Sequence, residues 1–272
     1  MERRWLVYPY HIWMLLFTVV PLALIFYFAF TVKGTYAFTL ENIQQAASPV
    51  YLKVLWHSVW LAAVSTFACF IIGYPMAMIL ATCRVKYRNM LVVITIIPMW
   101  MNFLLRTYAW MTLLEKKGLI NTVLSFFNIA PLQLLYTDGA VLLGMVYNFL
   151  PFMILPIYSV LMKMDRSLLE AAGDLGADAW TSFRRVTFPL SLPGVYAGML
   201  MVFMPAVTTF VISRLLGGGQ YMLIGNVIEQ QFRAIGDWNF GSALSVLMMI
   251  LIIISMGLLS RYNKNGNGGM LL

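Results

Sequence analysis

The sequence predicts an all-α integral membrane protein that crosses the bilayer about six times. Three observations lead to this prediction: 61% of the 272 residues are hydrophobic, only 10% are charged, and the mean hydropathy is +0.83. Soluble domains carry about 25% charged residues, so this composition excludes an ordinary soluble fold. A helix of about 20 apolar residues spans the hydrocarbon core of a bilayer, about 30 Å thick.

Long runs without charge therefore define the candidate spans. The chain is expected to form a single transmembrane domain over residues 1–272, with spans at about 12–32, 54–82, 90–114, 139–162, 190–213 and 240–260. The first run follows basic residues without a clear cleavage site of small residues, so we expect it to be retained as an anchor.

The segment 118–137 also lacks charge, but polar residues and a proline interrupt it. Leu119, Val123, Phe126 and Phe127 suggest one buried stripe on a helix. We expect a surface-lying or re-entrant helix here, and both alternatives stay open.

Basic residues give the orientation, because Lys and Arg are enriched in cytoplasmic loops. With a cytoplasmic N-terminus and six spans, the cytoplasmic side receives Arg3, Arg4, Arg84, Lys86, Arg88, Lys163, Arg166, Arg184, Arg185, Arg261 and Lys264. The other side receives the smaller set of Lys33, Lys53, Lys116, Lys117, Arg214 and Arg233. This bias predicts a multi-pass protein of the bacterial inner membrane with both termini in the cytoplasm.

The formal charge of +8 does not indicate a nucleic-acid partner, because the basic residues are scattered at the ends of apolar runs and form no stripe. A membrane surface explains them better. Cys69 and Cys83 have no metal-ligand spacing, so we expect packing thiols and no metal site.

The segment 165–189, between the fourth and fifth candidate spans, is the most polar stretch of comparable length. Ser167 and Glu170 have the spacing of a capping box, in which a hydroxyl and a carboxylate each satisfy a free backbone amide. We therefore expect a short helix that begins at Ser167. Gly176 is expected to end it, because glycine adopts positive φ without strain.

A second short helix is expected after this turn. Asp178 is placed to cap its first turn, and Arg184 and Arg185 suit its C-terminal end, where positive charge interacts favourably with the helix dipole. The prediction is a helix, a glycine turn and a helix on the cytoplasmic side.

The letters EAA at 170–172, then Gly176, then VTFP at 186–189, resemble the EAA motif of binding-protein-dependent ABC importer permeases of the type I fold. The family pattern ends in Ile-x-Leu-Pro, so Val186 and Phe188 are apolar departures from it. In that family this segment is a cytoplasmic coupling helix that docks on an ATPase subunit. The resemblance implies that the coupling residues are Glu170, Ala171, Ala172, Gly176 and Pro189.

Most of the chain resembles, more narrowly, the permeases of spermidine/putrescine importers, the PotB-like branch. The stretches that carry this resemblance are IPMWMN at 97–102 with Arg106 and Tyr108, LPFM at 150–153, LPIYS at 155–159 and MLIGNVI at 222–228. The expected partners are a homologous second permease, two ATPase subunits that use ATP and Mg, and a soluble substrate-binding protein. No glycine-rich stretch of this chain has the Lys-Ser or Lys-Thr of a Walker loop, so we expect no bound cofactor, no catalytic residue and no enzyme activity.

A polycationic substrate should meet carboxylates or aromatic faces, but none of the six candidate spans contains Asp or Glu. The one charge within them, Arg106, is open to two interpretations. Its role is structural, with the side chain near the outer interface or bonded to carbonyls and Asn102, or it acts in gating, since intramembrane charge indicates function. Aromatic residues near span ends also serve as interfacial anchors. The candidates for the translocation path are Trp100, Asn102, Arg106, Tyr108, Tyr147, Asn148, Glu229 and Asp237.

Two rival functions remain. A transporter driven by an ion gradient would normally place ionisable residues near the bilayer midplane, often in two related halves, and this sequence has neither. A structural or signalling membrane protein would not need the EAA spacing. An importer permease for another small solute is the nearest alternative to a polyamine permease.

Overall fold

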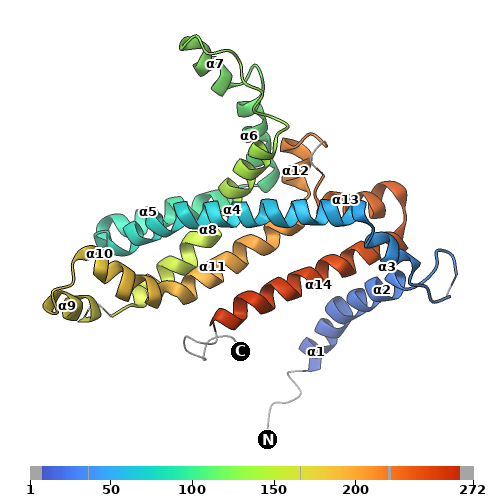
Figure 1. Cartoon of the computed structure of the whole chain (residues 1–272), viewed down its shortest axis with the longest axis horizontal. Helices are drawn as coiled ribbons and strands as arrows, with labels where there is room; N and C mark the ends of the chain where they lie inside the picture. The colour runs from blue at the N-terminus through green and yellow to red at the C-terminus, as the bar shows by residue number, and fades with distance from the viewer. Residues whose placement is uncertain (1–7, 36, 166, 220–221, 264–272) are drawn as a thin grey trace, which may run out of the picture.

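The fold is a bundle of long helices with two smaller parts that project from it (Figure 1). The computed structural model describes residues 8–35, 37–165, 167–219 and 222–263. Within these ranges the chain is helical, and its β-pairing is one isolated bridge between Thr31 and Phe38. The N-terminal basic pair, Arg166 and Lys264, used above for orientation, lie outside the described residues.

Five helical runs of the described residues are long and apolar enough to cross a membrane: Pro9–Ala29, Pro49–Thr82, Asp138–Lys163, Ala179–Thr208 and Trp238–Gly257. In order they belong to the following elements: α1 (Tyr8–Met14), η2 (Leu15–Val19) and α2 (Val20–Ala29); α4 (Pro49–Thr82); α8 (Asp138–Lys163); α10 (Ala179–Ser182), η3 (Phe183–Thr187) and α11 (Phe188–Thr208); and α14 (Trp238–Asn263). Each overlaps one expected span, which confirms the predicted all-helical membrane fold.

Contacts at the helix ends give the direction of each helix. His57 near the start of α4 faces Asp138 at the start of α8, with Nε2 and Oδ1 3.3 Å apart, so these helices run in the same direction. The hydroxyls of Tyr74, late in α4, and Ser191, early in α11, are 2.8 Å apart, so α11 runs the opposite way.

The outer pair of helices is joined in the same way. Asn239 at the start of α14 donates to the carbonyl of Thr31, just after α2, at 2.7 Å. Because α2 ends where α14 begins, the two helices run in opposite directions, and both described chain ends lie on the same side of the bundle.

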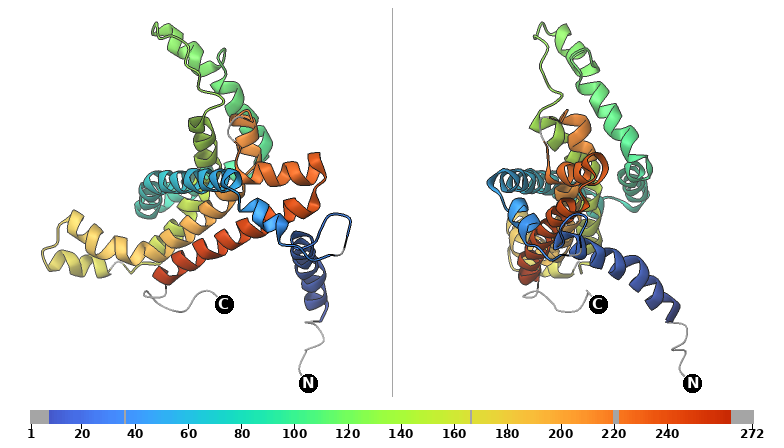
Figure 2. Two further views of the ribbon diagram at one scale, coloured as in Figure 1. Left: turned by 45° about the vertical axis from the view of Figure 1, so that its right-hand side comes forward. Right: turned by 90° about the vertical axis from the view of Figure 1, so that its right-hand side faces the viewer.

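The third expected span, 90–114, is not one continuous helix. α5 (Val85–Trp100) is followed by α6 (Phe103–Leu114) and α7 (Leu119–Phe126), and the direction changes by 92° at Met101 and Asn102. Pro98 leaves a carbonyl of α5 without its amide donor, and the Asn102 side chain starts a new helix by accepting from the amide of Leu104 at 2.9 Å. Figure 2 shows α6 and α7, in green, projecting upward and away from the bundle in both views.

The fifth expected span also has different limits. Its helix begins at Ala179, far before residue 190, and stops at Thr208, where α12 (Val211–Leu216) takes a new direction. Three further short elements are α3 (Glu41–Ala46), α13 (Ile224–Gln230) and η4 (Gln231–Ile235), which lie around the end of the bundle where α14 begins.

The main core lies between α4, α8 and α11, and glycines let these helices approach closely. A Cβ placed on Gly198 would lie 2.8 Å from the Met153 sulfur, and one on Gly194 would lie 2.8 Å from the Pro156 carbonyl oxygen. Small residues four apart permit this contact between membrane helices, where lipid removes the hydrophobic drive for association. A second core joins α2, α3, α13 and α14.

Candidate functional site

The first candidate site is the segment 165–189, which we call the elbow. It contains α9 (Ser167–Asp174), a turn, α10 and η3, and Figure 1 shows it projecting from one end of the bundle. This is the end where α4 and α8 finish, because Arg88, in the first turn of α5 that follows α4, donates to the Met162 sulfur near the end of α8 at 3.4 Å.

The helix α9 begins at the predicted residue but has a different cap. The Oδ1 of Asp165 accepts from the amide of Ser167 at 3.0 Å. This bond, with a smaller contribution from the Ser167 side chain, lowers the pKa of the Asp165 carboxyl below its usual value. The predicted capping box is therefore wrong in its first member, since Asp165 and not Ser167 accepts the free amide.

The turn after α9 has the predicted glycine geometry. Gly176 has φ +79, and its amide donates to the Gly173 carbonyl at 2.9 Å. The Ala177 amide donates to the Ala172 carbonyl at 3.0 Å. These two bonds form a Schellman motif, which satisfies carbonyls at the end of a helix and requires a left-handed residue at the glycine position.

The helix that follows the turn is capped as predicted but does not end as predicted. The Oδ1 of Asp178 accepts from the amide of Thr181 at 3.1 Å, and bonds from the Thr181 side chain and backbone lower the pKa of the Asp178 carboxyl. Arg184 and Arg185 do not lie at a helix end, because α10 continues through η3 into α11. The prediction of a separate short helix is wrong here: Pro189, which lacks an amide donor, is accommodated by the wider turn of η3 and does not break the helix.

The elbow surface is mostly free of contacts with the rest of the chain. Glu170, Ala171, Gly176 and Pro189 are exposed and Ala172 is half-buried. Large apolar side chains are exposed beside them, with Leu175 at 89% and Trp180 at 65% exposure. Exposed apolar surfaces of this kind are found at sites of protein or membrane contact.

An aromatic cluster that the sequence did not reveal fastens the elbow to the bundle. The Tyr74 ring lies 5.9 Å from that of Phe183 and 5.7 Å from that of Phe188, and Phe183 also stacks on Trp180 at 5.5 Å. Phe183 and Phe188 flank the arginine pair, which is a local signal. Tyr74 has none, because its partners are over 100 residues away.

The predicted path residues do not form one lined path within this chain. Trp100, at 87% exposure, and Tyr108 face away from the bundle. Asn102 caps α6 through its side chain and does not bond Arg106 by it; their bond joins the Arg106 amide and the Asn102 carbonyl at 3.2 Å.

Arg106 is buried at 8% exposure beside α8. It interacts electrostatically with Tyr147, which itself packs edge-on against Trp110 at 5.3 Å. Within the described residues, the Nε and Nη1 atoms of Arg106 and the Oδ1 atom of Asn148 are buried without a hydrogen-bond partner. These atoms are among the buried polar atoms of the described residues that the bundle leaves without a hydrogen-bond partner.

Glu229 and Asp237, the two acids predicted for the path, are already paired with basic residues at the end of the bundle where α14 begins. Glu229 forms ion pairs with Arg214 and Arg233, and its side chain is 12% exposed. Asp237 lies 3.9 Å from Lys33, and its other oxygen accepts from the Phe240 amide at the start of α14. Neither carboxylate offers uncompensated negative charge to a cation.

Comparisons with known proteins agree on the family and on the fold. Residues 73–265 match the model of the family described as "Binding-protein-dependent transport system inner membrane component". The chain is 40% identical over 259 residues to the spermidine/putrescine transport system permease protein PotB of Haemophilus influenzae, covering 93% of this chain and 91% of that protein. It is 40% identical over 247 residues to PotB of Escherichia coli K12, with 88% and 90% covered.

Solved structures share the fold at low sequence identity. A chain of a bacterial ABC transporter involved in the import of alginate superposes with a TM-score of 0.81 at 15% identity, over 98% of this chain and 97% of that chain. A chain of the MetNI methionine ABC transporter, in an inward-facing conformation, gives a TM-score of 0.54 at 18% identity, over 79% and 93%.

Proposed function

Because this chain belongs to the family of binding-protein-dependent transport system inner membrane components, we propose that it is the polyamine-importing permease whose elbow is driven by an ATPase subunit. Spermidine and putrescine are the proposed cargo, since the relatives at 40% identity are named for them. The proposed partners are a homologous second permease, two ATPase subunits that bind ATP and Mg, and a soluble substrate-binding protein.

The elbow is the observation that carries this proposal. It is held at three points, by Asp165, Gly176 and Asp178, and it presents exposed apolar side chains beside Glu170. Its second half is continuous with α11, so a force on it acts directly on a membrane helix. In this proposal the elbow faces the cytoplasm, which also puts both termini there.

Substrate choice belongs chiefly to the soluble binding protein in this proposal. The candidate spans contain no Asp or Glu, and Glu229 is neutralised by two arginines. A path without uncompensated negative charge lets a polycation pass without being trapped. The open polar atoms of Arg106 and Asn148 then face the second permease or water when the complex is assembled.

Reconstitution into liposomes with the candidate partner subunits tests the proposal. We expect ATP-dependent uptake of labelled spermidine or putrescine and no uptake of an unrelated cargo such as an acidic sugar. A preference for another small solute would overturn the cargo. Uptake that an ion gradient drives without ATP hydrolysis would overturn the importer function.

A further inference from the structure

The helix α7 and the residue after it expose an apolar stripe that the rest of the chain leaves uncovered. Phe126 is 81% exposed, Phe127 72%, Leu119 64% and Val123 47%. The spacing of these four residues predicts a buried stripe, but the rest of this chain does not bury them. Exposed apolar side chains of a membrane protein face lipid or another subunit, so the stripe is available to either.

The direction of α7 relative to the membrane follows from α5. The chain between the end of α4 and the start of α8 has to return across the bilayer, because α4 and α8 run the same way. The 16 residues of α5 run back along this path, and the segment Phe103–Phe126 leaves α5 at 92°. The arm formed by α6 and α7 therefore lies along the membrane plane, at the end of the bundle opposite the elbow.

A single buried side chain fixes which face of α7 points outward. The Asn121 amide donates to the carbonyls of Glu115 at 3.1 Å and Leu132 at 3.0 Å, and its oxygen accepts from the Leu132 amide at 2.9 Å. This side chain joins α7 to both of its flanking segments. The stripe consequently faces away from the segment that leads from α7 back to α8.

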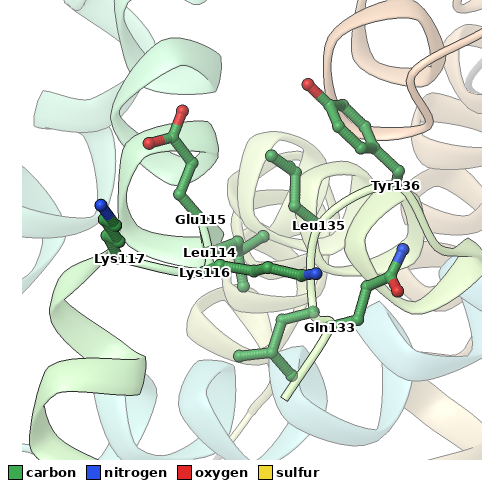
Figure 3. Close-up of a pocket in the computed structure, with 8 residues that line it drawn as sticks. Leu114, Glu115, Lys116, Lys117, Gln133, Leu135 and Tyr136 are labelled. Atoms are coloured by element: carbon green, nitrogen blue, oxygen red, sulfur yellow. The ribbon is translucent and has the colours of Figure 1, made fainter. Parts of the chain in front are cut away.

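Positive charge lies directly beside the stripe. Lys116 and Lys117 precede α7, and a hollow of about 430 Å³ lies between this turn and residues 133–136. Figure 3 shows Lys116 extended across the hollow toward Gln133, while Lys117 points the other way and Glu115 points away from both. The two cations outnumber the one acid of this turn, which matches the anionic phosphates of lipid headgroups.

We propose that α7 is an interfacial anchor for the lipid of the leaflet opposite the elbow. The stripe of Leu119, Val123, Phe126 and Phe127 inserts among acyl chains, and Lys116 and Lys117 lie at the level of the headgroup phosphates. An amphipathic helix with basic flanks binds a bilayer surface in this way. The proposal rests on the membrane-crossing fold of the proposed permease and not on its cargo.

Fluorescence quenching in the assembled complex tests the anchor. A bimane label is placed at Phe126→Cys or, as the matched control on the polar face of α7, at Ser125→Cys, each in a Cys69→Ala, Cys83→Ser chain. The complexes are held in lipid nanodiscs. We expect a nitroxide on the lipid acyl chains to quench the label at 126 more strongly than aqueous iodide does, and the order to reverse at 125.

Every other result at position 126 contradicts the anchor. Quenching chiefly by iodide would leave the stripe in water, and quenching by neither would bury it against a partner subunit. Loss of lipid quenching when the soluble binding protein is added would make the stripe a docking surface for that protein.

The lysines have a separate readout. In a Lys116→Gln, Lys117→Gln chain we expect weaker lipid quenching at 126 in anionic nanodiscs and no change in neutral ones. An equal effect in both lipids would remove the headgroup contact from the proposal. Because none of these measurements needs transport, their failure is distinguishable from failure of the uptake assay.

Discussion

The elbow and the arm both leave the bundle and expose apolar side chains, yet they are attached in different ways. The elbow continues as one helix into α11 and is packed through the aromatic cluster around Tyr74. The arm turns by 92° away from α5 and depends on asparagine side chains, Asn102 at its start and Asn121 at its far turn. A segment that is continuous with a spanning helix moves with it, whereas a segment joined through a sharp bend is free to stay with the lipid.

Removing the ring of Tyr74 should have the largest effect, because this ring attaches the elbow to the bundle. Tyr74→Ala empties a buried position that contacts both halves of the elbow junction, and loss of a large buried aromatic costs roughly 3–5 kcal/mol. We expect a large fall in thermal stability and loss of substrate-stimulated ATPase activity in the complex. Tyr74→Phe is the control: it loses only the bond to Ser191 and should keep most of both.

Truncating Asn121 should release the arm alone. Asn121→Ala removes three hydrogen bonds, each worth about 0.5–1.5 kcal/mol, because the backbone groups of Glu115 and Leu132 belong to exposed residues that water reaches. Faster amide hydrogen exchange is expected over residues 115–132, with no change in the elbow. Equal acceleration in both regions would mean that the two parts are not independent.

A bulky residue at Gly176 should damage the elbow without touching the bundle. A β-branched residue at φ +79 carries a strain of about 1–2 kcal/mol, so Gly176→Val should weaken recovery of the ATPase subunit by about tenfold and lower uptake with it. Gly173→Ala is the matched control, because a Cβ there meets nothing within 4 Å and φ is not positive. Unaltered recovery with Gly176→Val would count against the docking role.

Of these changes, acid should have the smallest effect on the elbow. The pKa values of Asp165 and Asp178 are lowered by bonds made in the folded state, so their capping contribution is complete above the ordinary carboxyl pKa of about 3.9 and is lost as the pH falls through the lower folded values. The hydrogen-exchange protection factors of α9 and α10, which remove the intrinsic pH dependence of amide exchange, should therefore be constant between about pH 5 and 8, where such carboxylates stay ionised. Asp178→Asn, which keeps a capping oxygen, should abolish the acid response of α10.

The sequence was sufficient for the features that depend on local chemistry. Charge-free runs gave the positions of the long helices, and Gly176 and Asp178 behave as their residue types predict. Features that depend on distant contacts were not visible in it. Tyr74 looks like any aromatic residue of a span, and the pairing of Glu229 with Arg214 requires the fold to bring α12 and α13 together.

Two predictions, the continuous span 90–114 and the buried stripe of α7, were wrong because composition and spacing do not determine geometry. An apolar run across 90–114 satisfies a hydropathy criterion whether or not Asn102 caps a new helix within it. The stripe of α7 has the spacing of a buried face, but spacing does not distinguish burial in protein from contact with lipid.

The uninterrupted helix from Ala179 to Thr208 has a consequence for the distant end of the molecule. Its 30 residues make a rod of about 45 Å, so a tilt of about 5° at the elbow displaces the far tip by about 4 Å. At that tip the chain is packed tightly on α13: a Cβ on Gly225 would lie 2.7 Å from the Thr208 carbonyl oxygen, and Asn226 donates to the Phe210 carbonyl at 2.8 Å. In the proposed mechanism, a small tilt of this helix at the elbow therefore displaces the segment that carries Glu229 at the opposite end of the bundle.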